Sequence, residues 1–451
     1  MNLEQYVKKK YGAVKPYWFI EEVGLMQNAE RVRTVKDIKD YLSGEHNIKN
    51  RPKFVYNGEI IEPRRIVINM AKTIISFKSQ YLLKNPVTMI GEESMVSKLN
   101  HASKLSRYDD KNNKIMTQLV QYGQVAEYVF IDNKGRINSK IIDSENGTPI
   151  WNQNNELIGF IESYIFDGIT YWYVYDDKTV TEYTNEGGEP HYIGTYISLS
   201  GLPIVYKTTD VLDDTSGRSE LLDWIPILDN MEDTISKYSD AFYKFMNPIP
   251  VVTGQQLRDA IPQEVVGGGI NLDDGADFKF ESTNLDYNSF RELYGKLNQT
   301  LLDVSNTPAV SMNKTDISNL SEVSIKMLFQ MADTSAGEYE TYMRNGMYQR
   351  YEKMARLMRY VGEGSISDDE LISLEFKFQY NTPSNNKEVM ENLKVQHEMG
   401  AISRETIIEQ SPYVSDVPLE LERLAREGQN SKVEDFSKVS GRVSVSEEET
   451  L

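Results

Sequence analysis

The residues of this chain with the potential for chemistry are pairs of neighbouring acidic side chains and four histidines. The acidic groups are Asp109-Asp110, Asp213-Asp214, Asp273-Asp274 and Asp368-Asp369-Glu370. Each falls in an expected turn, where solvated aspartate is common, although such carboxylates gathered in space could hold a metal for nuclease chemistry. The histidines share no spacing, and they are His46, His101, His191 and His397. No Walker A, H-E-x-x-H or G-x-S-x-G pattern occurs, so we predict no catalytic residue, metal site or cofactor.

A polar loop is the other candidate site. Apolar residues recur at helical spacing from Phe290 to Val304 and again from Leu320 to about Tyr360, and NTPAVSMNKTDISN lies between them. Thr307-Pro308 disfavours helix before the proline, and Asn319 with Glu322 can cap the second helix. Because loops held by rigid elements often carry function, we expect a functional loop over residues 305–319.

Composition limits the class of protein. At 451 residues we expect roughly two to four domains. The sequence contains no long apolar run typical of a membrane span, and the opening MNLEQYVKKKYG lacks the apolar run of a signal peptide. It contains no cysteine, which excludes disulfides and thiolate metal ligands and indicates a reducing cytosol or a particle assembled there. The net charge of −19 opposes tight phosphate binding.

The elements that must position the loop follow from periodicity. We expect helices in the first 45 residues, over Ile66–Leu83, Ile115–Gln121, Ser219–Met246, Met390–Met399 and Ser403–Glu409. Period-two runs predict one antiparallel meander over 127–207, with strands Tyr128–Ile131, Ile137–Ile142, Ile158–Phe166, Thr170–Tyr175 and Thr179–Tyr183. Further strands are expected at Ile249–Val252, Phe278–Phe280 and Leu371–Tyr380, while the last twenty or so residues read as disordered.

Three local features have competing interpretations. The stretch Gly44–Glu93 is locally basic, and a core helix with a solvated basic face is favoured over a nucleic-acid patch. The run Gly267-Gly268-Gly269 lacks the context of a phosphate loop, so we predict a flexible turn. The second long helix is rich in methionine and tyrosine, which favours core or subunit packing, and Gly337 and Gly346 are candidate bend points.

The order of these parts resembles the SPP1-like family of tailed-bacteriophage portal proteins. The residues that carry the resemblance are Tyr41-Leu42-Ser43-Gly44 with His46 and Ile48, Asn69-Met70-Ala71-Lys72, Tyr81-Leu82-Leu83-Lys84-Asn85-Pro86-Val87, Ser236 with Ser239-Asp240, and Ser321-Glu322-Val323-Ser324-Ile325-Lys326. The family often has Gly-Lys-Pro where Lys84-Asn85-Pro86 stands. The resemblance covers roughly residues 35 to 425.

The resemblance implies an α+β, multidomain portal fold in a ring of about twelve subunits around a DNA channel. The implied regions are a wing over 1–218 with the meander 127–207 at its periphery, stem helices over 219–247 and 286–304, a small α/β clip over 248–285, a tunnel loop over 305–319, further wing over 320–383, a helical crown over 384–430 and a tail over 431–451. The loop residues expected to face DNA are Asn306, Thr307, Met312, Asn313, Lys314 and Thr315.

The implied function is a non-enzymatic conduit at one capsid vertex of the virion, assembled in the host cytoplasm, for packaging and ejecting double-stranded DNA. Its implied partners are the terminase large subunit, a head-completion adaptor, and the major capsid and scaffolding proteins. An acidic channel wall would keep the duplex mobile, and Lys314, the only base between Lys296 and Lys326, would add one cationic ring. A solvated loop lysine is the equal alternative. A metal-dependent nuclease, or a minor capsid protein without a channel, remains the alternative function.

Overall fold

The computed structural model describes most of the chain: residues 1–12, 15–56, 59–211, 213–245, 249–254, 274–281, 286–309, 321–362, 364–383, 385–414, 417, 420–421 and 423–427. The chain divides into two compact units. The first contains 1–309 and 331–381, and the second contains 310–330 and 382–451. Helices and antiparallel sheets are both abundant, which confirms the mixed α and β class.

Helices open the first unit, as the sequence predicts: α1 (Leu3–Tyr11), α2 (Trp18–Val23) and α3 (Met26–Ser43). Residues 44–69 then form an extended strap, which contains the short 3-10 helix η1 (Asn47–Asn50) and the hairpin of β1 (Phe54–Tyr56) and β2 (Glu59–Ile61). The next helix, α4 (Met70–Leu83), begins four residues later than predicted. The prediction that this helix begins at Ile66 was wrong, because the Ile66 and Ile68 amides donate to side chains of another helix.

Two further helices precede the sheets. α5 (Glu93–Leu105) has no counterpart among the predicted elements, and α6 (Tyr108–Tyr122) is longer than the predicted Ile115–Gln121. Asp109 and Asp110 therefore lie in the first turn of α6 and not in a loop. Acidic residues stabilise this end of a helix because its free N–H groups carry partial positive charge.

The predicted single meander is two sheets. One is a five-stranded sheet in the order β10-β9-β8-β7-β6, and the other is a three-stranded sheet in the order β11-β4-β5. The strands are β4 (Gln124–Ile131), β5 (Ile137–Ile142), β6 (Gly147–Trp151), β7 (Leu157–Phe166), β8 (Ile169–Tyr175), β9 (Thr179–Thr184), β10 (His191–Ile197) and β11 (Ile204–Lys207). They pack together through a shared core of Ala126, Ile142, Phe160, Tyr175 and Val180. Trp172 lies on the opposite face, against Phe19 of α2, where it covers the sheet.

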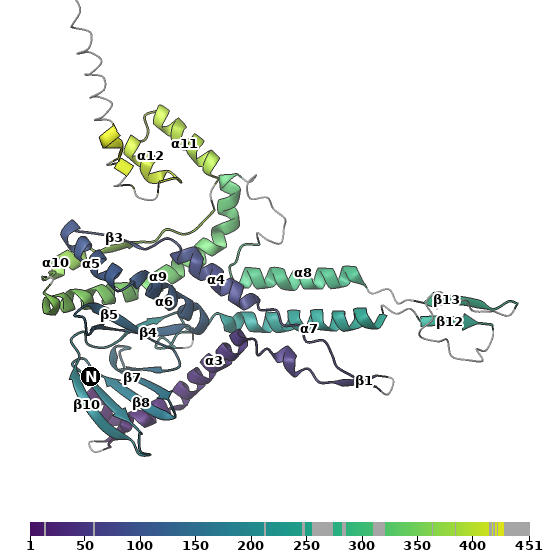
Figure 1. Cartoon of the computed structure of the whole chain (residues 1–451), viewed down its shortest axis with the longest axis horizontal. Helices are drawn as coiled ribbons and strands as arrows, with labels where there is room; N and C mark the ends of the chain where they lie inside the picture. Colours follow the sequence, from purple (N-terminus) through teal and green to yellow (C-terminus); the bar gives the residue numbers. More distant parts are fainter. Residues whose placement is uncertain are drawn as a thin grey trace, which may run out of the picture. The chain divides into compact units, whose positions relative to one another are not determined.

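Two long antiparallel helices leave this body side by side (Figure 1). They are α7 (Leu221–Phe245) and α8 (Tyr287–Val304), close to the predicted bounds. The rings of Tyr238 and Phe290 stack between them at 3.8 Å. Between the two helices in sequence lies an antiparallel hairpin of β12 (Ile249–Thr253) and β13 (Asp277–Glu281), which confirms both predicted strand pieces. The run Gly267-Gly268-Gly269 lies outside the described residues.

The second long helix, α9 (Glu322–Val361), contains 40 residues and continues through Gly337 and Gly346 without interruption. In the first unit six of its methionines and tyrosines are buried within this same chain, whereas Met331 and Tyr360 are exposed. The buried residues are Tyr339, Met343, Met347, Tyr351, Met354 and Met358. These residues therefore form core, which the sequence interpretation offered beside a subunit interface.

The predicted strand Leu371–Tyr380 is mostly not a strand. Its first residues end the short helix α10 (Asp368–Ile372), because Ser367 and Glu370 form a reciprocal capping box at the start of that helix. Asp368, Asp369 and Glu370 are consequently helical and not in a turn. Only β14 (Glu375–Lys377) is extended, and it pairs with β3 (Thr88–Ile90).

The second unit contains the two predicted C-terminal helices, α11 (Asn386–Glu398) and α12 (Arg404–Gln410). Each begins with a side-chain cap, from Asn385 and Ser403. Leu393 and Ile408 are their buried apolar residues. The predicted disordered tail, 431–451, lies outside the described residues.

Candidate functional site at the root of the polar loop

The chain enters the polar loop through a defined helix end. Asn306 has a φ of +53°, in the left-handed region that asparagine tolerates better than most residues. Its amide donates to the carbonyl of Asp303 at 3.2 Å, and the Thr307 amide donates to the carbonyl of Leu302 at 2.9 Å. These two bonds make a Schellman motif, which closes α8 and fixes the direction in which the loop departs.

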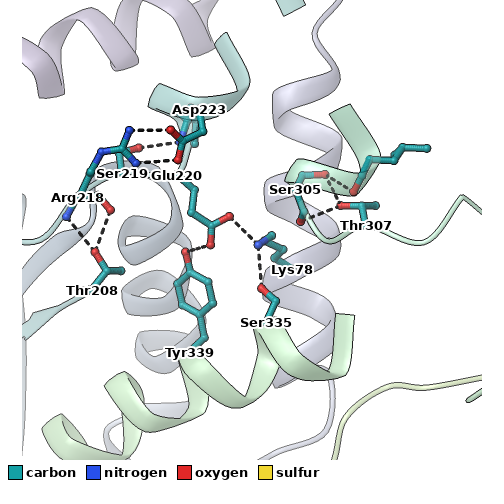
Figure 2. Close-up of polar contacts among 12 residues, drawn as sticks. Lys78, Thr208, Arg218, Ser219, Glu220, Asp223, Ser305, Thr307, Ser335 and Tyr339 are labelled. Carbon is teal, nitrogen blue, oxygen red and sulfur yellow. Dashed lines mark hydrogen bonds and ion pairs between the residues drawn. The ribbon is translucent and has the colours of Figure 1, made fainter. Parts of the chain in front are cut away.

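A buried polar junction joins three other helices near this point (Figure 2). Lys78 of α4 has a side chain only 4% exposed, and its Nζ lies 2.6 Å from Oε2 of Glu220. The same Nζ donates to Oγ of Ser335 on α9 at 2.9 Å, and the Tyr339 hydroxyl donates to Oε1 of Glu220 at 2.5 Å. Burial and then the Glu220 carboxylate raise the pKa of Tyr339 well above its ordinary value, so this phenol stays protonated as a donor.

The residues just before α7 are anchored from several sides. Arg218 makes two 2.7 Å bonds to the carboxylate of Asp223, a bidentate pair that is rigid as well as strong. Ser219 donates to the carbonyl of Gln121, at the end of α6, at 2.5 Å. Thr208 donates to the carbonyl of Arg218 and accepts from its amide. These contacts therefore fix the backbone beside Glu220 independently of its bond to Lys78.

The loop root and the buried junction border one small cavity. Asn306 shares its lining with Lys78, Ser335 and Tyr339. The end of α8, the start of α7, and the helices α4 and α9 thus meet around the first residues of the loop. Because the Lys78 charge is paired inside the protein, this junction is suited to hold the loop root and not to bind a phosphate.

The structure describes two of the six predicted DNA-facing residues. Asn306 and Thr307 lie in the Schellman motif, and contact with DNA stays a prediction for them. Met312, Asn313, Lys314 and Thr315 lie outside the described residues, so their position also stays a prediction. The sequence does not predict the junction of Lys78, Glu220, Ser335 and Tyr339, because no linear spacing connects residues so far apart. Lys78, expected on a solvated basic face, is buried.

A row of hydrogen bonds attaches the strap to α7. Alternate strap amides, of Arg64, Ile66 and Ile68, donate to Asp240, Ser236 and Glu232 on successive turns of the helix. Two extended residues advance about 6.6 Å and four helical residues about 6 Å, so the two spacings match. Several residues that carried the family resemblance, including His46, Ser236 and Asp240, therefore act in this one contact.

His46 and Glu232 form the deepest part of this row. Nδ1 of His46 lies 2.6 Å from Oε1 of Glu232, and both side chains are completely buried. The Tyr41 ring stacks on His46 at 3.8 Å. Burial is the largest cause of a raised pKa for Glu232, although the bonds from Ile68 and His46 oppose it.

The acidic groups of the sequence do not assemble into a metal site in the described part of the chain. Among those residues no three His, Asp or Glu side chains are placed to hold a metal ion. Nor is any described helix both long and apolar enough to span a membrane.

The sequence matches a known protein family over most of its length. The sequence model described as phage portal protein, SPP1 Gp6-like, matches residues 25–434. The chain belongs to this family of phage portal proteins. The family is structural and not enzymatic, which is consistent with a non-enzymatic protein.

One curated protein and several solved structures are similar to this chain. The portal protein of Bacillus phage SPP1 is 21% identical over 390 residues, which cover 79% of this chain and 74% of that protein. Among solved structures, a chain from the neck of an empty gene transfer agent particle computed with C6 symmetry has a TM-score of 0.48 and 12% identity, and covers 90% of this chain and 98% of that chain. A chain from the neck of a native particle computed with C12 symmetry has a TM-score of 0.44 and 13% identity, over 76% and 90% of the two chains.

Proposed function

We propose that about twelve copies of this portal protein form a ring at one capsid vertex, around a channel for packaging and ejecting double-stranded DNA. Beside the family membership, one observation carries this proposal. The paired helices α7 and α8 expose large apolar side chains to solvent in the isolated chain, among them Phe242, Tyr243, Tyr287 and Leu293. Apolar surface of this kind marks a protein interface, and neighbouring copies in a ring would cover it.

The regions of the chain take their roles from this proposal. Residues 219–247 and 286–304 are the stem, 248–285 the clip, and 305–319 the tunnel loop. Residues 1–218 and 320–383 form the wing, 384–430 the crown and 431–451 a tail. The buried junction at Lys78 and Glu220 then lies where the stem meets the wing, and supports the loop at its root.

The loop is the proposed point of contact with DNA, through Asn306, Thr307, Met312, Asn313, Lys314 and Thr315. The net charge of −19 favours a channel through which DNA passes and not one that binds it tightly, because each phosphate that a protein neutralises adds affinity. The terminase large subunit is the proposed partner during packaging, a head-completion adaptor the partner afterwards, and the capsid and scaffolding proteins the surroundings of the ring.

Electron microscopy of the purified protein tests the ring directly. In negative stain, at several salt concentrations, we expect rings with an axial hole. A protein that stays monomeric under every salt condition, by sedimentation and by microscopy, contradicts the proposal. Magnesium-dependent plasmid cleavage that is lost on replacing the acidic pairs would restore the nuclease.

A further inference from the structure

The five-stranded sheet has one open edge, the strand β10. Among the described strands β10 pairs with β9 alone. Six of its seven residues are exposed, and the most exposed apolar side chains are Tyr192 at 56% and Ile197 at 79%. An open strand that is both apolar and exposed is a template for pairing with another chain.

The opposite edge of the same sheet, β6, is closed to such pairing. It contains Pro149, which has no amide hydrogen to offer a further strand. The Arg31 guanidinium donates to the carbonyls of Ser144 and Gly147, the latter at 2.6 Å. Proteins usually protect the edge of a sheet with proline, with charged residues or with a covering segment. In contrast to β6, β10 contains no proline and no Lys, Arg, Asp or Glu.

The backbone of β10 presents its outer groups at known positions. The Ser198 amide donates to the Lys178 carbonyl at 2.7 Å, toward β9. Because amides along an antiparallel strand alternate between the two sides, Tyr196 also faces β9, whereas Thr195 and Ile197 direct their amides to the open side. These outward groups are the donors and acceptors that an added strand would use.

The charge around β10 indicates what kind of strand fits. Residues 167–197 contain six acidic residues and one basic residue, a net charge of −5. Glu186 and Glu189, in the turn that leads into β10, are exposed. The β10 strand of a second copy is a poor occupant, since two β10 strands would meet across a twofold axis and bring two acidic surfaces together.

We propose that β10 is a docking strand that binds, by β-strand addition, an extended segment of another protein that carries lysine or arginine. Backbone bonds to β10 give the affinity, and the acidic turn selects the basic segment. The proposal goes beyond the portal function and does not depend on the ring assignment.

Peptide binding to the purified full-length protein tests the proposal. The probe is a fluorescein-labelled peptide of seven residues, the length of β10, in which threonine and valine alternate between two terminal lysines. The control peptide has glutamates at its ends. By fluorescence anisotropy we expect the lysine peptide to bind saturably, and the glutamate peptide to bind at least about tenfold more weakly.

Two substitutions at one position separate the open edge from the rest of the strand. Thr195→Pro removes an outward amide while the bonds to β9 remain, and we expect it to abolish binding. Thr195→Val is the matched control, because it loses the same hydroxyl contact with Thr181 but keeps the amide, and should bind like the wild type. Circular dichroism checks that both variants fold.

A charge reversal tests the proposal even if Thr195→Pro does not fold. Glu186→Lys combined with Glu189→Lys should remove most of the preference for the lysine peptide, because it neutralises most of the local negative charge. Equal binding of both peptides by the wild type, no saturable binding, or unchanged binding by folded Thr195→Pro would each overturn the proposal. So would a change in oligomeric state caused by Thr195→Pro and not by Thr195→Val, because β10 would then contact a second copy.

Discussion

At Gly346 the long helix α9 lies directly against Tyr206 of the three-stranded sheet. A Cβ atom at this position would lie 1.9 Å from Cε1 of Tyr206 on β11. Tyr206 is buried, and its hydroxyl donates to Oε2 of Glu127 at 2.7 Å. Arg350, one turn further along α9, contacts the same oxygen at 2.8 Å. Tyr206 therefore has little freedom to move away, and the close approach requires glycine.

The first prediction concerns this contact. Gly346→Ala should lower the free energy of unfolding by about 1–3 kcal/mol, because the added methyl overpacks the helix against Tyr206. Gly337→Ala, in the same helix, meets only the Tyr380 hydroxyl at 3.7 Å and should instead gain up to about 1 kcal/mol from helix propensity. Thermal unfolding of both variants measures the difference, and equal shifts would contradict the close approach.

The buried pair of His46 and Glu232 predicts a pH dependence. Burial raises the pKa of Glu232 above its ordinary 4.5, so the folded protein holds this proton more tightly than the unfolded chain does. The stability that the group contributes is complete below pH 4.5 and is lost as the pH rises through the raised pKa. Glu232→Gln removes this titration and keeps an oxygen that can accept from Ile68 and His46.

The second prediction follows from the raised pKa of Glu232. The free energy of unfolding of Glu232→Gln minus that of the wild type should increase as the pH rises from 4.5, at up to about 1.4 kcal/mol per pH unit. Denaturant unfolding at a series of pH values measures it. Glu189→Gln, on an exposed turn, is the control and should run parallel to the wild type. Parallel curves for Glu232→Gln would show that Glu232 titrates as it does in the unfolded chain.

Among the elements, the helices around the loop root depend on each other through Lys78. Its ammonium group reaches Glu220 beside α7 and Ser335 on α9, so it connects α4 to both. Glu220 retains some exposure to water at 27%, which limits the cost of leaving it unpaired. The junction therefore fixes where α7, α9 and the loop root meet, more than it adds to overall stability.

The third prediction tests this connection. Lys78→Met should lower the free energy of unfolding by about 1–3 kcal/mol, because Ser335 and Oε2 of Glu220 lose the Lys78 ammonium as their donor. If the junction supports the loop, DNA packaging should fall further than this loss of stability explains. Lys72→Met, on an exposed site of the same helix, is the matched control and should stay within about 0.5 kcal/mol of the wild type. Equal behaviour of the two variants would contradict a role for the junction.

The elements also show what a sequence can predict here. Helices with a continuous apolar stripe, such as α8 and α9, were predicted to within a few residues, because burial of one face imposes the spacing. The strand β10 was missed because both of its faces are exposed, so no alternation marks it. Composition predicts the loop over 305–319, most of which lies outside the described residues, whereas Lys78, Glu220 and Tyr339 meet only through tertiary packing.

At the scale of the whole molecule, charge is the property that limits function. A chain with a net charge of −19 repels DNA overall. In a ring of about twelve copies, one lysine in the loop of each subunit would form a single belt of positive charge within that field. Such a belt could contact passing phosphates briefly without holding the duplex, because the surrounding carboxylates oppose any further gain in affinity.

The last prediction concerns this belt. Lys314→Glu should leave ring assembly intact and reduce the DNA packaged per capsid, measured as nuclease-protected DNA, because the belt would then repel the phosphates. Lys9→Glu makes the same change in net charge at an exposed position on α1, and should package like the wild type. Rings counted by microscopy separate a packaging defect from an assembly defect. If both variants package normally, Lys314 is a solvated loop lysine, and the acidic wall alone accounts for the passage of DNA.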